Sequence, residues 1–94
     1  MNIKIKVTKR DIQKAVRCSH TKCPIANAVR RQLERPVGSV YVNTFWVAVY
    51  ELGAPSRPLV TWKPTRAAEK FMSDFDTGKK VKPTTFTLRE WTQK

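Results

Sequence analysis

The chain has 94 residues, 40% of them hydrophobic, which suffices for one modest core and is too little for a second domain that folds independently. It carries 19 Lys and Arg but only seven Asp and Glu, so its formal net charge is +12 at pH 7. This charge favours nucleic acid, an acidic protein surface or anionic lipid as the partner, and it argues against an acidic enzyme substrate.

The positive charge is greatest in the first third of the chain. Residues 1–35 carry ten bases and two acids, residues 36–62 one of each, and residues 63–94 eight bases and four acids. No apolar run follows Met1, and no stretch is long enough to span a bilayer. We therefore expect a cytoplasmic protein with two reduced thiols, no secretion signal and no membrane partner.

The first two elements are predicted from alternation and from a capping signal. Apolar and polar residues alternate over 3–7, which predicts a strand whose wet face carries Lys4 and Lys6. Thr8, followed three residues later by Asp11, resembles a capping box and predicts a short helix over about Lys9–Val16. Its outward face would carry Arg10, Lys14 and Arg17, and its inward face Ile12, Ala15 and Val16.

A second helix is predicted from Pro24 to about Glu34. Pro24 suits the first helical position, which makes Cys23 the N-cap, and Pro36 ends the pattern. Apolar residues recur on one face at the three-and-four spacing, while the other face is basic and carries Arg30, Arg31 and Arg35. Lys22 lies in the turn just before it.

The middle of the chain is predicted to form a hairpin from Ser39–Val42 and Phe45–Leu52, which are rich in Val, Tyr, Phe and Trp. The second arm is apolar on both faces. We therefore expect it to be a central strand, or to meet a partner with its second face, which leaves a homodimer open as an alternative. Ala54–Pro58, with its two prolines, is predicted to be a loop, and Leu59–Trp62 a short edge strand.

A third helix begins at Pro64 and Thr65, and ends near Gly78. A last strand is indicated by the alternation of Phe86 and Leu88 with polar residues. The order is thus β-α-α-β-β-(β)-α-β, where the strand in parentheses is Leu59–Trp62. This order predicts one small two-layer α+β domain over residues 1–94, with an antiparallel or mixed sheet and helices on one face.

Cys18, His20 and Cys23 are the nearest approach to a metal site. A closed structural zinc site needs four ligands, and the chain has no further Cys or His to supply the fourth. No acid lies near enough in sequence to orient a Cys/His pair for catalysis. We therefore expect no metal, no cofactor and no enzymatic activity, with Cys23 as a half-buried capping residue and Cys18 as a core thiol.

The basic residues form the stronger signal. Phosphates are bound by many point charges or guanidinium groups along one surface, and the first strand and first two helices supply them. An exposed Tyr41 could add base stacking, as could Tyr50 and Trp91, while most Phe residues and at least one Trp must fill the core. The predicted binding residues are Lys4, Lys6, Arg10, Lys14, Arg17, Lys22, Arg30, Arg31, Arg35 and Tyr41.

Two stretches resemble small uncharacterised proteins encoded by bacteriophages and prophages. They are C-P-I-A-x-A at Cys23–Ala28 and F-x-x-x-F-D-x-G-K-x-V-x-P-x-x-F-x-L from Phe71 to Leu88. The resemblance implies a phage-type accessory protein that acts in the host cell cytoplasm. It carries over no established activity.

Two functions follow as hypotheses. The first is a non-enzymatic protein that binds DNA, RNA or a nucleoprotein through its basic surface. The alternative is a host-takeover or anti-defence inhibitor, of the anti-CRISPR kind, that binds a host protein complex. Steep salt dependence of nucleic-acid binding would favour the first, and a tight complex with a host protein the second.

Overall fold

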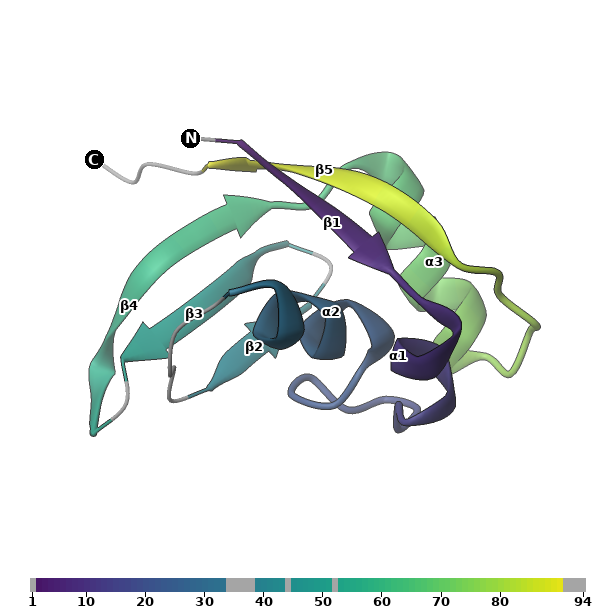
Figure 1. Cartoon of the computed structure of the whole chain (residues 1–94), viewed down its shortest axis with the longest axis horizontal. Coiled ribbons are helices and arrows are strands. Elements are labelled where there is room, and N and C mark those ends of the chain that lie inside the picture. The colour runs from purple at the N-terminus through teal and green to yellow at the C-terminus, as the bar shows by residue number, and fades with distance from the viewer. Residues whose placement is uncertain (1, 34–38, 44, 52, 91–94) are drawn as a thin grey trace.

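The computed structural model describes residues 2–33, 39–43, 45–51 and 53–90, and its elements follow the predicted order (Figure 1). Within these residues, three helices and five antiparallel strands make a small α+β fold, which confirms the predicted fold class. In chain order the elements are β1 (Ile3–Val7), α1 (Lys9–Gln13), α2 (Pro24–Gln32), β2 (Val40–Val42), β3 (Val47–Glu51), β4 (Ala54–Lys63), α3 (Arg66–Asp76) and β5 (Thr84–Glu90).

The five strands form one curled sheet in the order β1-β5-β4-β3-β2, with every neighbouring pair antiparallel. The first and last strands of the chain therefore lie side by side, with Ile5 opposite Phe86. In Figure 1 the strands arch over the helices, and β1 and β2 form the two edges of the sheet. The doubly apolar β3 is an internal strand between β2 and β4, as its composition predicted.

The core lies between the inner face of the sheet and helices α2 and α3. Alternate residues of the strands join the buried residues of both helices in a single apolar cluster. Phe71 on α3 meets Phe86 on β5 edge to face, with 5.2 Å between ring centroids. Trp62 is also buried, as expected of at least one Trp. The prediction that most Phe residues fill the core was wrong for Phe45, which precedes β3 and is 70% exposed.

Helix α1 has the predicted capping box but is shorter than predicted. The Thr8 hydroxyl accepts from the Asp11 amide, and the Asp11 carboxylate accepts from the Thr8 amide. The helix ends at Gln13, so the residues after Lys14 do not continue its inward face. Val16 is consequently 50% exposed, and its predicted inward position was wrong. Five residues are too few for an independent helix, so α1 depends on its contacts with α2.

Strand β4 corrects two further predictions. Ala54–Pro58 is not a loop, because the strand runs through it from Ala54 to Lys63. Pro58 lies opposite Tyr50, where the pairing with β3 shifts register, and a register shift is a position at which a strand tolerates proline. Leu59–Trp62 is not an edge strand, since β4 lies between β3 and β5.

Helix α3 ends as its sequence predicted. Thr65 caps its start, Asp76 is its last residue, and Gly78 follows with φ +88°, a conformation that glycine adopts without strain. No helix among residues 2–33, 39–43, 45–51 and 53–90 is long and apolar enough to cross a membrane. The predictions made for Arg35, Trp91, and the chain at Thr44 and Leu52 lie outside the described residues.

Candidate nucleic-acid interface

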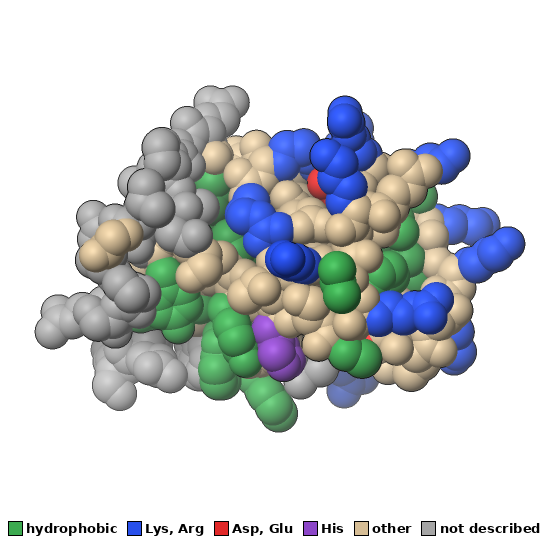
Figure 2. Space-filling model, turned by 90° about the horizontal axis from the view of Figure 1, so that it is seen from below, with side chains coloured by type: hydrophobic (Ala, Val, Ile, Leu, Met, Phe, Trp, Pro, Cys, Tyr) green, Lys and Arg blue, Asp and Glu red, His purple; other side chains and the backbone are tan. Residues whose placement is uncertain are grey.

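Four of the predicted binding residues surround one hollow between α1 and α2. Its volume is about 470 Å³, and Arg10, Lys14, Arg30 and Arg31 line it together with Asp11 and Asn27. Figure 2 shows a face of the molecule on which many Lys and Arg side chains gather, with little acidic surface between them. The fold therefore brings these four basic residues together around one hollow.

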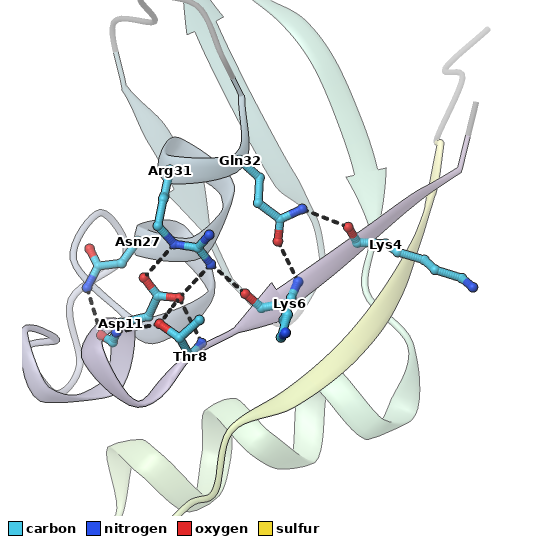
Figure 3. Close-up of polar contacts among 7 residues, drawn as sticks. All are labelled: Lys4, Lys6, Thr8, Asp11, Asn27, Arg31 and Gln32. Carbon is cyan, nitrogen blue, oxygen red and sulfur yellow. Dashed lines mark hydrogen bonds and ion pairs between the residues drawn. The ribbon is translucent and has the colours of Figure 1, made fainter.

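Asp11, the one acid that lines this hollow, already forms an ion pair with Arg31. The Asp11 side chain is 7% exposed, and its Oδ2 lies 3.0 Å from Nη2 of Arg31 (Figure 3). Burial alone would raise the pKa of Asp11, but hydrogen bonds from Arg31 and from Thr8 outweigh it, so the pKa is lowered from 3.8. Asp11 is thus a charged, structural residue that does not neutralise Arg10 or Lys14.

Arg31 and Gln32 also bind the backbone of the edge strand β1. Arg31 Nη2 donates to the Lys6 carbonyl at 2.7 Å, and Gln32 Nε2 donates to the Lys4 carbonyl at 2.9 Å. The Gln32 side-chain oxygen accepts from the Lys6 amide (Figure 3). Backbone groups that an edge strand would otherwise offer to another strand are therefore satisfied by α2.

Arg30 serves mainly to hold the loop before α2. Its guanidinium donates to the Thr21 carbonyl and to the side-chain oxygen of Asn27. Asn27 in turn donates to the Asp11 carbonyl at 3.0 Å. Arg30 and Arg31 thus direct part of their hydrogen-bonding capacity inward, whereas Arg10 and Lys14 are exposed and form no ion pair with any described residue.

The other described residues of the predicted set lie outside this hollow. Lys4 and Lys6 are exposed on the outer face of β1, and Lys6 borders a second, smaller hollow with Lys9. Arg17 and Lys22 are exposed in the loop between α1 and α2, not on a helix. The Arg17 guanidinium lies against Gly78 at the end of α3.

Cys18, His20 and Cys23 line a separate hollow of about 280 Å³ beside the end of α3. Cys23 is the N-cap of α2, as predicted, and its sulfur accepts from the Ala26 amide at 3.4 Å. Burial raises the pKa of the Cys23 thiol above 9.0. Within the described parts of the chain, no three His, Cys, Asp or Glu residues are arranged to hold a metal ion.

Cys18 is not the core thiol that the sequence suggested. It is exposed, has φ +57°, and its amide donates to the Asp76 carboxylate at 2.9 Å. The bond draws the α1–α2 loop to the end of α3. Cys18 stays at the surface because the chain turns sharply here instead of continuing α1 toward the core.

Tyr41 is half-buried and stacks on His20, with ring centroids 4.9 Å apart and an interplanar angle of 18°. His20 Nδ1 lies 2.9 Å from the Val42 carbonyl, to which it donates, and the His20 carbonyl accepts from the Val42 amide at 2.7 Å. His20 therefore covers the exposed edge of β2 much as Gln32 covers that of β1.

Three contributors were missing from the sequence-based set. Gln32 binds β1, and Lys63 and Arg89 lie opposite each other on β4 and β5. Alternation in β5 could have placed Arg89 on the wet face, but nothing in the sequence pairs it with Lys63.

No known protein family matches the chain, and neither a curated protein nor a solved structure matches it.

Proposed function

We propose that this chain is a small phage-type accessory protein that binds nucleic acid through its basic surface, without catalysis. The net charge of +12 supplies the general attraction, because each phosphate contact releases condensed counterions. The resemblance at Cys23–Ala28 and Phe71–Leu88 supports the phage assignment. Binding of this kind contacts phosphates and is largely independent of base sequence.

The hollow between α1 and α2 is the single observation that carries the proposal. It gathers Arg10, Lys14, Arg30 and Arg31 around one acid, Asp11, that is buried and already paired. Asp11 neutralises only Arg31, and uncompensated cations that lie close together cost folding stability, so the grouping of the other three is better explained by an anionic ligand. Arg10 and Lys14 are the residues best placed to contact phosphate, since both are exposed.

The test measures affinity for a duplex and for a single strand over a series of salt concentrations. We expect the logarithm of the binding constant to fall steeply and linearly with the logarithm of salt concentration. The double variant Arg10→Ala/Lys14→Ala should reduce this slope by about two, roughly one for each phosphate that is no longer bound. It should also weaken all sequences alike. Arg30 and Arg31 are unsuitable for this test because their replacement disturbs the loop and the Asp11 pair.

The matched control is Lys80→Ala/Lys82→Ala, which removes the same charge from exposed positions between α3 and β5. It should change the slope less than Arg10→Ala/Lys14→Ala. Equal slopes for the two double variants would show that only net charge matters. Binding that is absent, or insensitive to salt, would contradict the proposal.

The alternative partner is a host protein complex, which the chain would inhibit. Phe45, 70% exposed just before β3, favours this alternative because large aromatic side chains are common anchors at protein interfaces. Under this alternative, Phe45→Ser would abolish the complex, and nucleic acid would bind weakly or not at all.

A further inference from the structure

The outer face of the curled sheet presents a second cationic surface, distinct from the hollow between the helices. Strand residues alternate between faces, and Ile5, Trp62 and Leu88 belong to the core. Their neighbours Lys4 and Lys6 on β1, Lys63 on β4 and Arg89 on β5 therefore point away from the core, and all four are exposed. We call these four residues the sheet cations.

Two of the sheet cations face each other in a way that folding alone does not favour. Lys63 and Arg89 are direct partners in the β4–β5 register, so their Cβ atoms are about 5 Å apart. Like charges directly opposite each other on one sheet face destabilise the pairing. On β1, Lys4 and Lys6 lie opposite Thr87 and Thr85, so no acid lies across the strand pair from them either. An anion bound over this face would offset the repulsion.

The other end of the same face carries aromatic rings. Tyr41 is the register partner of Ala48, which lies between the core residues Val47 and Val49 and is therefore on the opposite face of the sheet. Tyr50 follows two residues after Ala48 and shares its face. Both tyrosines are half-buried, and His20 extends the aromatic surface by stacking on Tyr41. From β1 to β2 there are four strand spacings, which add up to about 19 Å along the curled surface of the sheet.

We propose that this outer face binds single-stranded nucleic acid, with phosphates at the sheet cations and bases against Tyr41 and Tyr50. The inference rests on the proposed function and narrows it to a ligand class. Rings on the same face as the cations suit a single strand, whose unpaired bases can stack on aromatic side chains, and they add little for a duplex, whose bases are already stacked. The distance from β1 to β2 accommodates a short run of nucleotides of the size that one small domain covers.

The test compares oligothymidine with a duplex of equal length, for the whole chain and for Lys63→Thr/Arg89→Thr. Thr suits a strand and matches the neighbouring Thr61 and Thr87, so the variant keeps the local composition. We expect the unmodified chain to prefer oligothymidine. The double variant should bind it about tenfold more weakly at low salt. Its melting temperature should stay unchanged or rise, because the like-charge pair is gone.

Two further variants make the test specific. Lys80→Thr/Lys82→Thr removes the same charge elsewhere and should weaken oligothymidine binding clearly less. Tyr50→Leu keeps an apolar side chain but removes the ring, and should weaken oligothymidine binding about fivefold while leaving duplex binding unchanged.

The outcomes separate the two proposals. Equal loss in the sheet and control variants, or no preference for the single strand, would overturn the inference. If Arg10→Ala/Lys14→Ala still weakens duplex binding in that case, the proposed function stands. A chain that binds neither oligothymidine nor duplex would overturn both.

Discussion

Arg31 holds Asp11 in place. Nη2 of Arg31 lies 3.0 Å from Oδ2 of Asp11, whose side chain is 7% exposed, and the same Nη2 donates to the Lys6 carbonyl. One side chain on α2 thereby joins the start of α1 to the end of β1. The same residue was expected to bind phosphate, and about half of its side chain remains exposed to do so. Structural and binding roles therefore meet in Arg31, and stability measurements can separate them.

Arg31→Ala should lower the free energy of unfolding by about 1–3 kcal/mol, because it leaves the buried Asp11 carboxylate without its cation. This loss is smaller than is usual when a buried ion pair is broken, since Arg31 is 47% exposed. Urea unfolding measures the loss. Arg10→Ala removes the same charge from an exposed position and should change stability by less than about 0.5 kcal/mol. Similar effects from the two variants would show that the Asp11 contact adds little.

The same pair predicts how stability depends on acid. The pKa of Asp11 is lowered in the folded protein, so folding holds the carboxylate ionised at a pH where the unfolded chain binds a proton. Its contribution is complete above the unfolded pKa of about 3.8 and is lost as the pH falls through the folded pKa. Urea unfolding between neutral pH and pH about 3 should therefore show a loss of stability that is smaller in Asp11→Asn.

Asp74→Asn is the comparison for this acid dependence. A hydrogen bond from Lys70 lowers the pKa of Asp74 as well, so this residue also contributes with the same sign. Its partners Lys70 and Lys79 are well exposed, however, and solvent screens such pairs. If Asp74→Asn reduces the loss of stability at low pH more than Asp11→Asn does, the assignment of that loss mainly to Asp11 is wrong.

Local signals made the start of each helix predictable. Thr8 and Cys23 cap their helices as expected, and the third helix begins where Pro64 and Thr65 predicted, with Thr65 as its cap, because a capping residue acts on amides only two or three positions away. The path of β4 could not be predicted in the same way. Its prolines favour a loop locally, and only pairing with β3 across a register shift makes Ala54–Pro58 a strand.

The candidate site was predictable in composition but not in its division of roles. A basic face on α2 follows from the spacing of Arg30 and Arg31, yet both point some of their donors at internal acceptors. Those acceptors, the Thr21 carbonyl and the Asp11 carboxylate, lie nine and 20 residues away in sequence. Such contacts depend on tertiary structure, and no short-range pattern records them.

Gln32 should protect the edge of β1. Its side chain accepts from the Lys6 amide and donates to the Lys4 carbonyl, so Gln32→Ala removes both bonds and should cost about 1–2 kcal/mol. The sharper readout is hydrogen exchange, in which the Lys6 amide should exchange faster while the Ile5 amide, from an inward-facing residue paired with β5, changes less. Gln13→Ala, at the exposed end of α1, is the control. Unchanged exchange at Lys6 would show that the edge is protected by something other than Gln32.

The two cysteines should differ sharply in reactivity. Cys18 is exposed, whereas Cys23 is buried and burial raises the pKa of its thiol, so little thiolate forms near neutral pH. A thiol reagent should label one cysteine per folded chain rapidly, and Cys18→Ser should abolish that phase. In urea both cysteines of the unmodified chain should react.

The Cys23 thiol should also make folding stability fall at alkaline pH. Its pKa is raised in the folded state, so its contribution is complete below the unfolded value of about 9.0 and declines as the pH rises through the folded pKa. Cys23→Ser should remove that decline yet keep the cap of α2, since Ser is a preferred N-cap residue. Cys23→Ala removes the cap as well and should be less stable than Cys23→Ser by about 1 kcal/mol. Equal stability of the Ser and Ala variants would show that the bond from the Ala26 amide to the Cys23 sulfur contributes nothing to the helix.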